Sequence, residues 1–184
     1  RSGDCADLSV LYASLFEAAG IETAFVTVPG HIFMAFDLGM SMEEARARAQ
    51  DERELIDRDG RAWVPVETTM LGKPFLRAWE EAAKTYARYA GTADLAVNPI
   101  HEGWERYAPV TLLETQWSPA MPDADMSEKV YFEDMNSLIE RELQRKAQAL
   151  NDRITREPVN PALHNSLGVL YARYAKYSDA EKCF

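Results

Sequence analysis

Three side chains of this sequence could together perform nucleophilic catalysis. Cys5 lies at the start of a predicted helix, whose positive end favours thiolate over thiol. His31 follows a Pro29-Gly30 turn and begins an apolar strand, where its imidazole can act as a general base. Glu67 ends a later apolar strand and can orient the imidazole and stabilise its charged form. The combination predicts a cysteine–histidine–acid site.

Each of these residues also has an explanation that involves no chemistry. A free cysteine is most often simply buried, a lone histidine beside a strand is usually structural, and a strand-end carboxylate often faces solvent. Asp57 is a competing acid, although its place just before the Arg58-Asp59-Gly60 turn favours a role in that turn. A metal site is disfavoured because Cys5, His31 and Glu67 have no fourth ligand nearby in the sequence. We therefore expect no metal ion and no other cofactor.

The elements that must position these side chains follow an α+β pattern. Apolar residues at three- and four-residue spacing after Cys5 predict a helix with one apolar face, made of Leu8, Leu11, Tyr12, Leu15 and Ala19. Asp4 can cap the start of this helix, and Gly20 can end it. The remaining predicted elements are strands over residues 21–28 and 32–36, a short helix over 42–50, a hairpin over 54–67 and a helix over about 75–90.

Several ordered motifs in residues 1–70 resemble the transglutaminase-like family of papain-like cysteine domains. Gly3, Cys5 and Asp7 match the Gly-x-Cys-x-Asp start of the family's first helix, which ends here in a Gly20-Ile21 turn. A histidine that starts a strand and an acid within a Trp-x-x-x-Asp-x-Thr segment complete the family's pattern. In this chain the corresponding stretches are Val28-Pro29-Gly30-His31 and Trp63-Val64-Pro65-Val66-Glu67-Thr68-Thr69.

The resemblance implies a papain-like core with Cys5 as nucleophile, His31 as base and Glu67 as orienting acid. The acid is a glutamate where aspartate is usual, Phe33 stands where a tryptophan is common, and the predicted helix over 42–50 lengthens the histidine-to-acid interval. We expect the backbone N–H of Cys5 to be one oxyanion donor. In related folds the second donor is a side chain upstream of the cysteine, outside the given sequence.

The last part of the chain is helical throughout and resembles a tetratricopeptide repeat. From about Glu133 an apolar stripe runs to Pro158, and a helix pair begins near Pro161. The residues that match the repeat are Leu167, Gly168, Tyr171, Ala180 and Phe184, with His164 replacing the first aromatic. We assign these residues to packing, because the small ones allow two helices to approach closely. Cys183 is expected to be a buried or half-buried side chain without chemistry.

We expect three parts along the chain. These are an N-terminally truncated transglutaminase-like core over residues 1–114, a linker over 115–130 and a helical segment with a partial repeat over 131–184. Because Arg1 immediately precedes the cysteine motif, we interpret the chain as an excised fragment, and the sequence does not indicate its compartment.

Charge and hydropathy limit the classes of partner. A formal net charge of −10 argues against nucleic acid or anionic lipid as the main partner. No apolar run approaches the ~20 residues that a membrane helix requires. The expected partners are a peptide or protein substrate and, through a helical repeat array, other proteins.

Two functions from different classes fit these features. The first is acyl transfer from amide bonds by Cys5, with water or an amine as acceptor, and we favour water because it is the default acceptor. The alternative is a catalytically silent domain that binds peptide and serves, with its repeats, as an assembly module. The glutamate at position 67 favours the alternative, whereas Cys5 and His31 in their motifs count against it.

The two cysteines should differ in reactivity if Cys5 is an activated nucleophile. We expect iodoacetamide near pH 6 to label Cys5 well ahead of Cys183, as mapped by mass spectrometry, because only a thiolate reacts readily. Equal or reversed labelling would contradict an activated nucleophile. A Cys5 that is buried and resists alkylation would favour the silent, peptide-binding domain.

Overall fold

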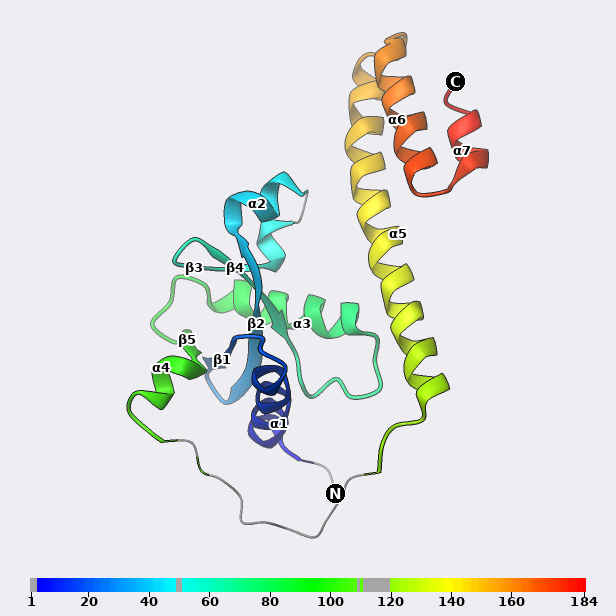
Figure 1. Ribbon diagram of the computed structural model, residues 1–184. Coiled ribbons are helices and arrows are strands. Elements are labelled where there is room, and N and C mark those ends of the chain that lie inside the picture. The colour runs from blue at the N-terminus through cyan, green and yellow to red at the C-terminus, as the bar shows by residue number, and fades with distance from the viewer. Residues whose placement is uncertain (1–2, 49–50, 109, 111–119) are drawn as a thin grey trace. The chain divides into compact units, whose positions relative to one another are not determined.

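The computed structural model of the protein describes residues 3–48, 51–108, 110 and 120–184. The chain divides into two compact units, Arg1–Pro122 and Asp123–Phe184 (Figure 1). The first unit mixes helices and strands, and the second is helical. Residues 49–50 of the helix predicted over 42–50 and residues 115–119 of the predicted linker lie outside the described ranges.

The first unit contains one antiparallel sheet with helices on it, which confirms the α+β class. Its strands are β1 (Thr23–Val28), β2 (His31–Ser41), β3 (Ile56–Arg58), β4 (Arg61–Val66) and β5 (Ala96–Pro99), paired in the order β3-β4-β2-β1-β5. Its helices are α1 (Cys5–Ala18), α2 (Met42–Ala47), the 3₁₀ turn η1 (Glu52–Glu54), α3 (Phe75–Tyr89) and α4 (Ile100–Trp104).

Two tight hairpins set the register of the strands around the site. Pro29-Gly30 joins β1 to β2 with Gly30 at φ 73°, and the first pair beyond the turn is Val28 with His31. Asp59-Gly60 joins β3 to β4 with both residues left-handed, at φ 53° and 80°. Two successive positive φ values are the signature of the turn that matches strand twist, which is why Asp-Gly forms this hairpin.

Helix α1 lies against the sheet with a face that differs from the predicted one. Ser9 and Ala13 are fully buried, whereas Leu11 and Leu15 are 54% and 58% exposed. The prediction that Leu11 and Leu15 belong to the packed face is therefore wrong. Because this helix is apolar nearly all round, the spacing of its apolar residues could not distinguish the face on the sheet from the face toward solvent.

Helix α3 covers the other face of the sheet. Ala82 packs in one cluster with alternate residues of the strands, which are Ala24, Val26, Val28, Phe33, Ala35, Ile56 and Trp63. Side chains of a strand alternate between faces, and Phe33 and Ala35 of β2 belong to the cluster with Ala82. Phe36 contacts Phe16 of α1 at a ring-centroid distance of 5.2 Å and also Phe75, the first residue of α3, at 6.4 Å. Figure 1 shows α1 in front of the sheet and α3 behind it.

The sheet is curled, so that its two edge strands are linked by a side chain. Arg58 of β3 donates through Nη1 to the carbonyl oxygen of Val97 in β5 at 2.9 Å and pairs through Nη2 with Glu102 of α4. Both β5 and α4 fall in a proline-containing stretch for which the sequence analysis named no helix or strand. Pairing with β1 orders the β5 part of this stretch.

The second unit consists of α5 (Ala124–Arg156), α6 (Pro161–Arg173) and α7 (Tyr177–Glu181). Helix α5 is 33 residues long and begins inside the range predicted as linker. Its buried residues Leu143 and Ala147 belong to its C-terminal half, and α6 buries Leu163 and Leu167. Within the described ranges, no helix combines the length and apolar character needed to cross a membrane.

Gly168 of α6, which the sequence analysis expected to let two helices approach closely, instead leaves room for an aromatic side chain. A Cβ atom at this position would lie 2.6 Å from Cζ of Phe184, so the phenyl ring occupies the space that a side chain would need. Cys183 is half-buried, as predicted, and its thiol lies 3.3 Å from the carbonyl oxygen of Asp179. Phe184 itself remains 75% exposed, so the helix pair leaves an apolar surface.

We predict that residues 133–184 depend on neighbouring structure for their stability. Few side chains of this segment are buried, and it exposes Ile139 at 41%, Tyr177 at 66% and Phe184 at 75%. A peptide of these residues alone should show weak helical circular dichroism, because one repeat cannot bury its own apolar face. A cooperative thermal melt of this peptide would contradict the prediction.

Candidate active site

His31 and Glu67 lie in direct contact, although 36 residues separate them in the sequence. Nε2 of His31 and Oε2 of Glu67 are 2.6 Å apart, with the histidine side chain 29% exposed and the glutamate 7% exposed. His31 begins β2 and Glu67 follows β4, and these strands are neighbours in the sheet. The register of the two strands therefore brings the predicted base and the predicted acid together.

The second oxygen of Glu67 is held by Thr69. Oε1 accepts hydrogen bonds from the Thr69 backbone N–H at 3.0 Å and from its hydroxyl at 2.6 Å. The backbone N–H of Glu67 donates to the carbonyl oxygen of Ala78 in α3 at 3.0 Å. Both carboxylate oxygens and the backbone of Glu67 are thus fixed, which a buried carboxylate requires.

The contact with Glu67 determines which nitrogen of His31 remains for chemistry. A carboxylate only accepts hydrogen bonds, so Nε2 of His31 carries a proton and donates it to Glu67. In the neutral ring Nδ1 is then unprotonated and can accept a proton from a thiol. A negative Glu67 also stabilises the imidazolium that such a transfer creates.

Helix α1 and strand β2 run side by side in the same direction, which locates Cys5 relative to His31. Ser9 lies beside Ile32, with Oγ 3.5 Å from the carbonyl oxygen, and Phe16 lies beside Phe36. From Ser9 to Phe16 the helix rises about 10 Å, at ~1.5 Å per residue. From Ile32 to Phe36 the strand rises about 13 Å, at ~3.3 Å per residue, so equal lengths of helix and strand lie beside each other.

Cys5 precedes Ser9 by one helical turn on the same face of α1. The four residues from Ser9 back to Cys5 span about 6 Å of helix, which equals the length of about two strand residues. Cys5 is therefore level with the residues just before Ile32, which are His31 and the hairpin turn. Cys5 is partly buried, and among the described residues no hydrogen bond joins its sulfur to His31. Cys5 therefore lies at about the same level along the sheet as His31, whose contact with Glu67 is formed. Hydrogen bonds between a catalytic thiol and its base often tighten only when substrate binds.

The start of α1 is organised by two aspartates. The Asp4 carboxylate accepts from the backbone N–H groups of Ala6 and Asp7, and the Asp7 carboxylate accepts from the N–H of Asp4 at 3.3 Å. A Cβ atom at Gly3 would lie 2.9 Å from Cβ of Asp7, so the glycine leaves room for this reciprocal cap. The negative Asp4 carboxylate thus lies at the positive end of α1, next to Cys5 in the chain.

The Asp4 carboxylate accepts the backbone N–H groups of Ala6 and Asp7 but not that of Cys5. Among the described residues, the backbone N–H of Cys5 has no acceptor. A free N–H at the nucleophile is the kind of donor that stabilises a tetrahedral oxyanion. This geometry fits the donor expected from the sequence.

Asp57, the competing acid, serves the hairpin turn. Its Oδ1 accepts the backbone N–H of Gly60 at 3.0 Å, and the residue is exposed. Burial raises the pKa of Tyr86 in α3, and the negative charge of Asp57 adds to this effect. The Asp57 carboxylate thus lies near α3 and the turn, whereas Glu67 contacts His31.

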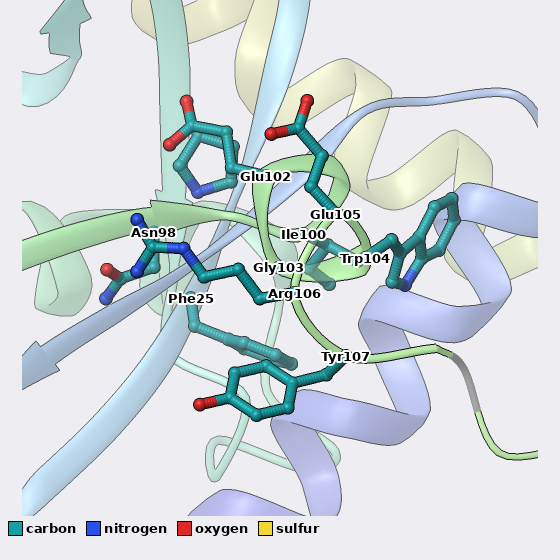
Figure 2. A pocket seen from close by; sticks show the side chains of 10 residues that line it. Phe25, Asn98, Ile100, Glu102, Gly103, Trp104, Glu105, Arg106 and Tyr107 are labelled. Carbon is teal, nitrogen blue, oxygen red and sulfur yellow. The ribbon is translucent and has the colours of Figure 1, made fainter.

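A separate pocket of about 660 Å³ lies at the other edge of the sheet, beside β5 and α4 (Figure 2). Phe25, Ile100, Trp104 and Tyr107 line it, together with charged residues of the α4 region. Cys5, His31 and Glu67 are not among its lining residues. No three His, Cys, Asp or Glu side chains of the described ranges are grouped to hold a metal ion.

The sequence analysis missed the residues that hold the site residues in place. Thr69 belongs to a recognised motif, but its bonds to Glu67 were not predicted. Ser9 lies on the same helical face as Cys5 and is fully buried, although serine is usually exposed. The sequence feature that could have indicated the role of Ser9 is its polar side chain one helical turn after Cys5.

Comparisons of the chain with protein-family models, with curated proteins and with solved structures found no match. What supports the site is therefore its own geometry, in which a buried glutamate and a partly exposed histidine lie in direct contact.

Replacing Glu67 with Gln should reduce the reactivity of Cys5. Glutamine keeps the size of the side chain but removes the charge that stabilises the imidazolium. Hydrogen bonds to charged groups contribute about 1.5–3 kcal/mol, so we expect the alkylation rate of Cys5 near pH 6 to fall roughly ten- to a hundredfold. The pH at which alkylation reaches half its maximum should move upward, as measured by iodoacetamide labelling over pH 5–10.

Asp57→Asn is the matched control, because it also neutralises an acid near the sheet. It should leave the pH profile of Cys5 nearly unchanged, since Asp57 bonds to the turn at Gly60. A profile that moves with Asp57→Asn and not with Glu67→Gln would identify Asp57 as the acid. If neither variant moves it, no acid assists His31.

Proposed function

We propose that this chain contains a transglutaminase-like cysteine site that transfers acyl groups from amide bonds. The observation that supports this most strongly is the 2.6 Å contact between His31 Nε2 and Glu67 Oε2 beside the Cys5 end of α1. This contact leaves Nδ1 as the ring nitrogen available to a thiol. A papain-like arrangement of the core, with a cysteine helix against an antiparallel sheet, belongs to the same proposal.

In the proposed reaction, Nδ1 of His31 takes the proton of the Cys5 thiol, and the sulfur attacks the amide carbonyl carbon. The backbone N–H of Cys5 donates to the oxyanion of the tetrahedral intermediate. As the carbon–nitrogen bond breaks, Nδ1–H donates its proton to the leaving amine, and a thioester to Cys5 remains.

The second half of the reaction releases the acyl group. Water or an amine attacks the thioester carbon while His31 takes its proton, and the Cys5 sulfur leaves and is reprotonated. Water yields a carboxylic acid, and an amine yields a new amide. We favour hydrolysis, since water is present at high concentration at a histidine that is 29% exposed.

A search for Cys5-dependent turnover tests the proposal. The full chain is incubated with a mixed library of short blocked peptides containing Gln and Asn, with and without excess putrescine, and products are followed by mass spectrometry. We expect cleaved or deamidated peptides, or putrescine adducts. Cys5→Ala should lower the rate by at least about 10³-fold, because it removes the nucleophile.

Cys183→Ala is the control, since Cys183 is a half-buried thiol in the other unit, and it should retain full activity. Product formation that is equal in Cys5→Ala and the parent would refute the proposal. Peptide binding by both proteins without turnover would also refute it and would support a silent, peptide-binding module coupled to helical repeats.

A further inference from the structure

A buried polar junction lies directly beneath the candidate site. Oγ of Ser9 and Oγ1 of Thr68 are 3.0 Å apart, and Oγ of Ser9 is 3.5 Å from the carbonyl oxygen of Ile32. Ser9 is fully buried and Thr68 is 4% exposed. The distances fit a chain in which the threonine hydroxyl donates to the serine, and the serine hydroxyl donates to the carbonyl.

Each member of this junction is tied to one residue of the site. Ser9 lies one helical turn after Cys5, Ile32 follows His31, and Thr68 follows Glu67. The pairing of β2 with β4 ends at Met34 and Val66, so Ile32 and Thr68 are not joined by the β2–β4 backbone ladder. The junction therefore connects α1, the start of β2 and the segment after β4 beyond the last backbone pair of β2 with β4.

We propose that Ser9 and Thr68 are positioning residues that set the separation between Cys5 and the His31–Glu67 pair. The inference rests on the proposed function. Apolar contacts are non-directional and allow a helix to slide on a sheet, whereas buried hydroxyls need partners with correct geometry. A slide of about 1 Å can cost on the order of 10²-fold in rate when it displaces a reacting atom.

The other end of α1 has a second polar attachment, which provides a matched control. Oε1 of Glu17 accepts from the backbone N–H and the hydroxyl of Thr23, each at 2.7 Å, and Oε2 of Glu17 pairs with His101. Thr23 is fully buried, as Thr68 nearly is. Removing either threonine hydroxyl deletes one hydrogen bond between α1 and the sheet region, the Thr68 bond toward the N-terminal end of the helix and the Thr23 bond toward its C-terminal end.

The test compares Thr68→Val and Ser9→Ala with Thr23→Val in the full chain. Two quantities are measured, the pH profile of Cys5 alkylation by iodoacetamide and the urea midpoint of unfolding. We expect all three variants to lower the urea midpoint. Only Thr68→Val and Ser9→Ala should slow Cys5 alkylation near pH 6, on the order of five- to tenfold, and move its profile to higher pH. Thr68→Ser, which keeps the hydroxyl, should restore the parent profile.

An unchanged profile in both Thr68→Val and Ser9→Ala, with the urea midpoint lowered as in Thr23→Val, would overturn the inference and leave the junction purely structural. An equal loss of reactivity in Thr23→Val would also overturn it. Should Thr68→Val fail to fold, Ser9→Ala makes the same comparison. The unsubstituted protein distinguishes failure of the positioning role from failure of the proposed function. If its Cys5 is no more reactive than Cys183, the proposed function itself is refuted.

Discussion

The alignment of α1 with β2 is the constraint on which the candidate site depends. The helix begins at Cys5 and the strand begins at His31, and Ser9 lies beside Ile32 as Phe16 lies beside Phe36. A shift of one helical turn would move Cys5 by about 5.4 Å along the sheet relative to His31. The proposed chemistry of the thiol therefore depends on how a helix packs, as much as on which residues are present.

Features with a short-range cause were predictable from the sequence. Asp4 caps α1, and the Asp59-Gly60 pair makes the hairpin turn, because each needs only its immediate neighbours. The pairing of His31 with Glu67 is a long-range contact and was expected through a family resemblance. The structure places the two side chains 2.6 Å apart, and the roles of Cys5, His31 and Glu67 in catalysis stay a prediction.

Features decided by tertiary packing were not predictable in the same way. The buried face of α1 could not be read from a helix that is apolar nearly all round, and Ser9 instead of Leu11 lies against the sheet. Strand β5 is four residues long and contains Pro99, so local propensity gave no strand signal. Its order comes from pairing with β1, a partner far away in the sequence. The helical segment was predicted from residue 131, whereas α5 begins at Ala124 with Asp123 as its N-cap. The prolines just before Asp123 favoured the interpretation of this stretch as a linker.

The link that Arg58 makes between β3 and β5 has a consequence for behaviour at high concentration. The open edge of a sheet is a template on which another chain can add a strand and begin aggregation. Here the guanidinium occupies the outward carbonyl of Val97, and Pro99 in the same strand has no N–H to offer. Together, Arg58 and Pro99 leave this edge with fewer free backbone groups on which another chain could add a strand.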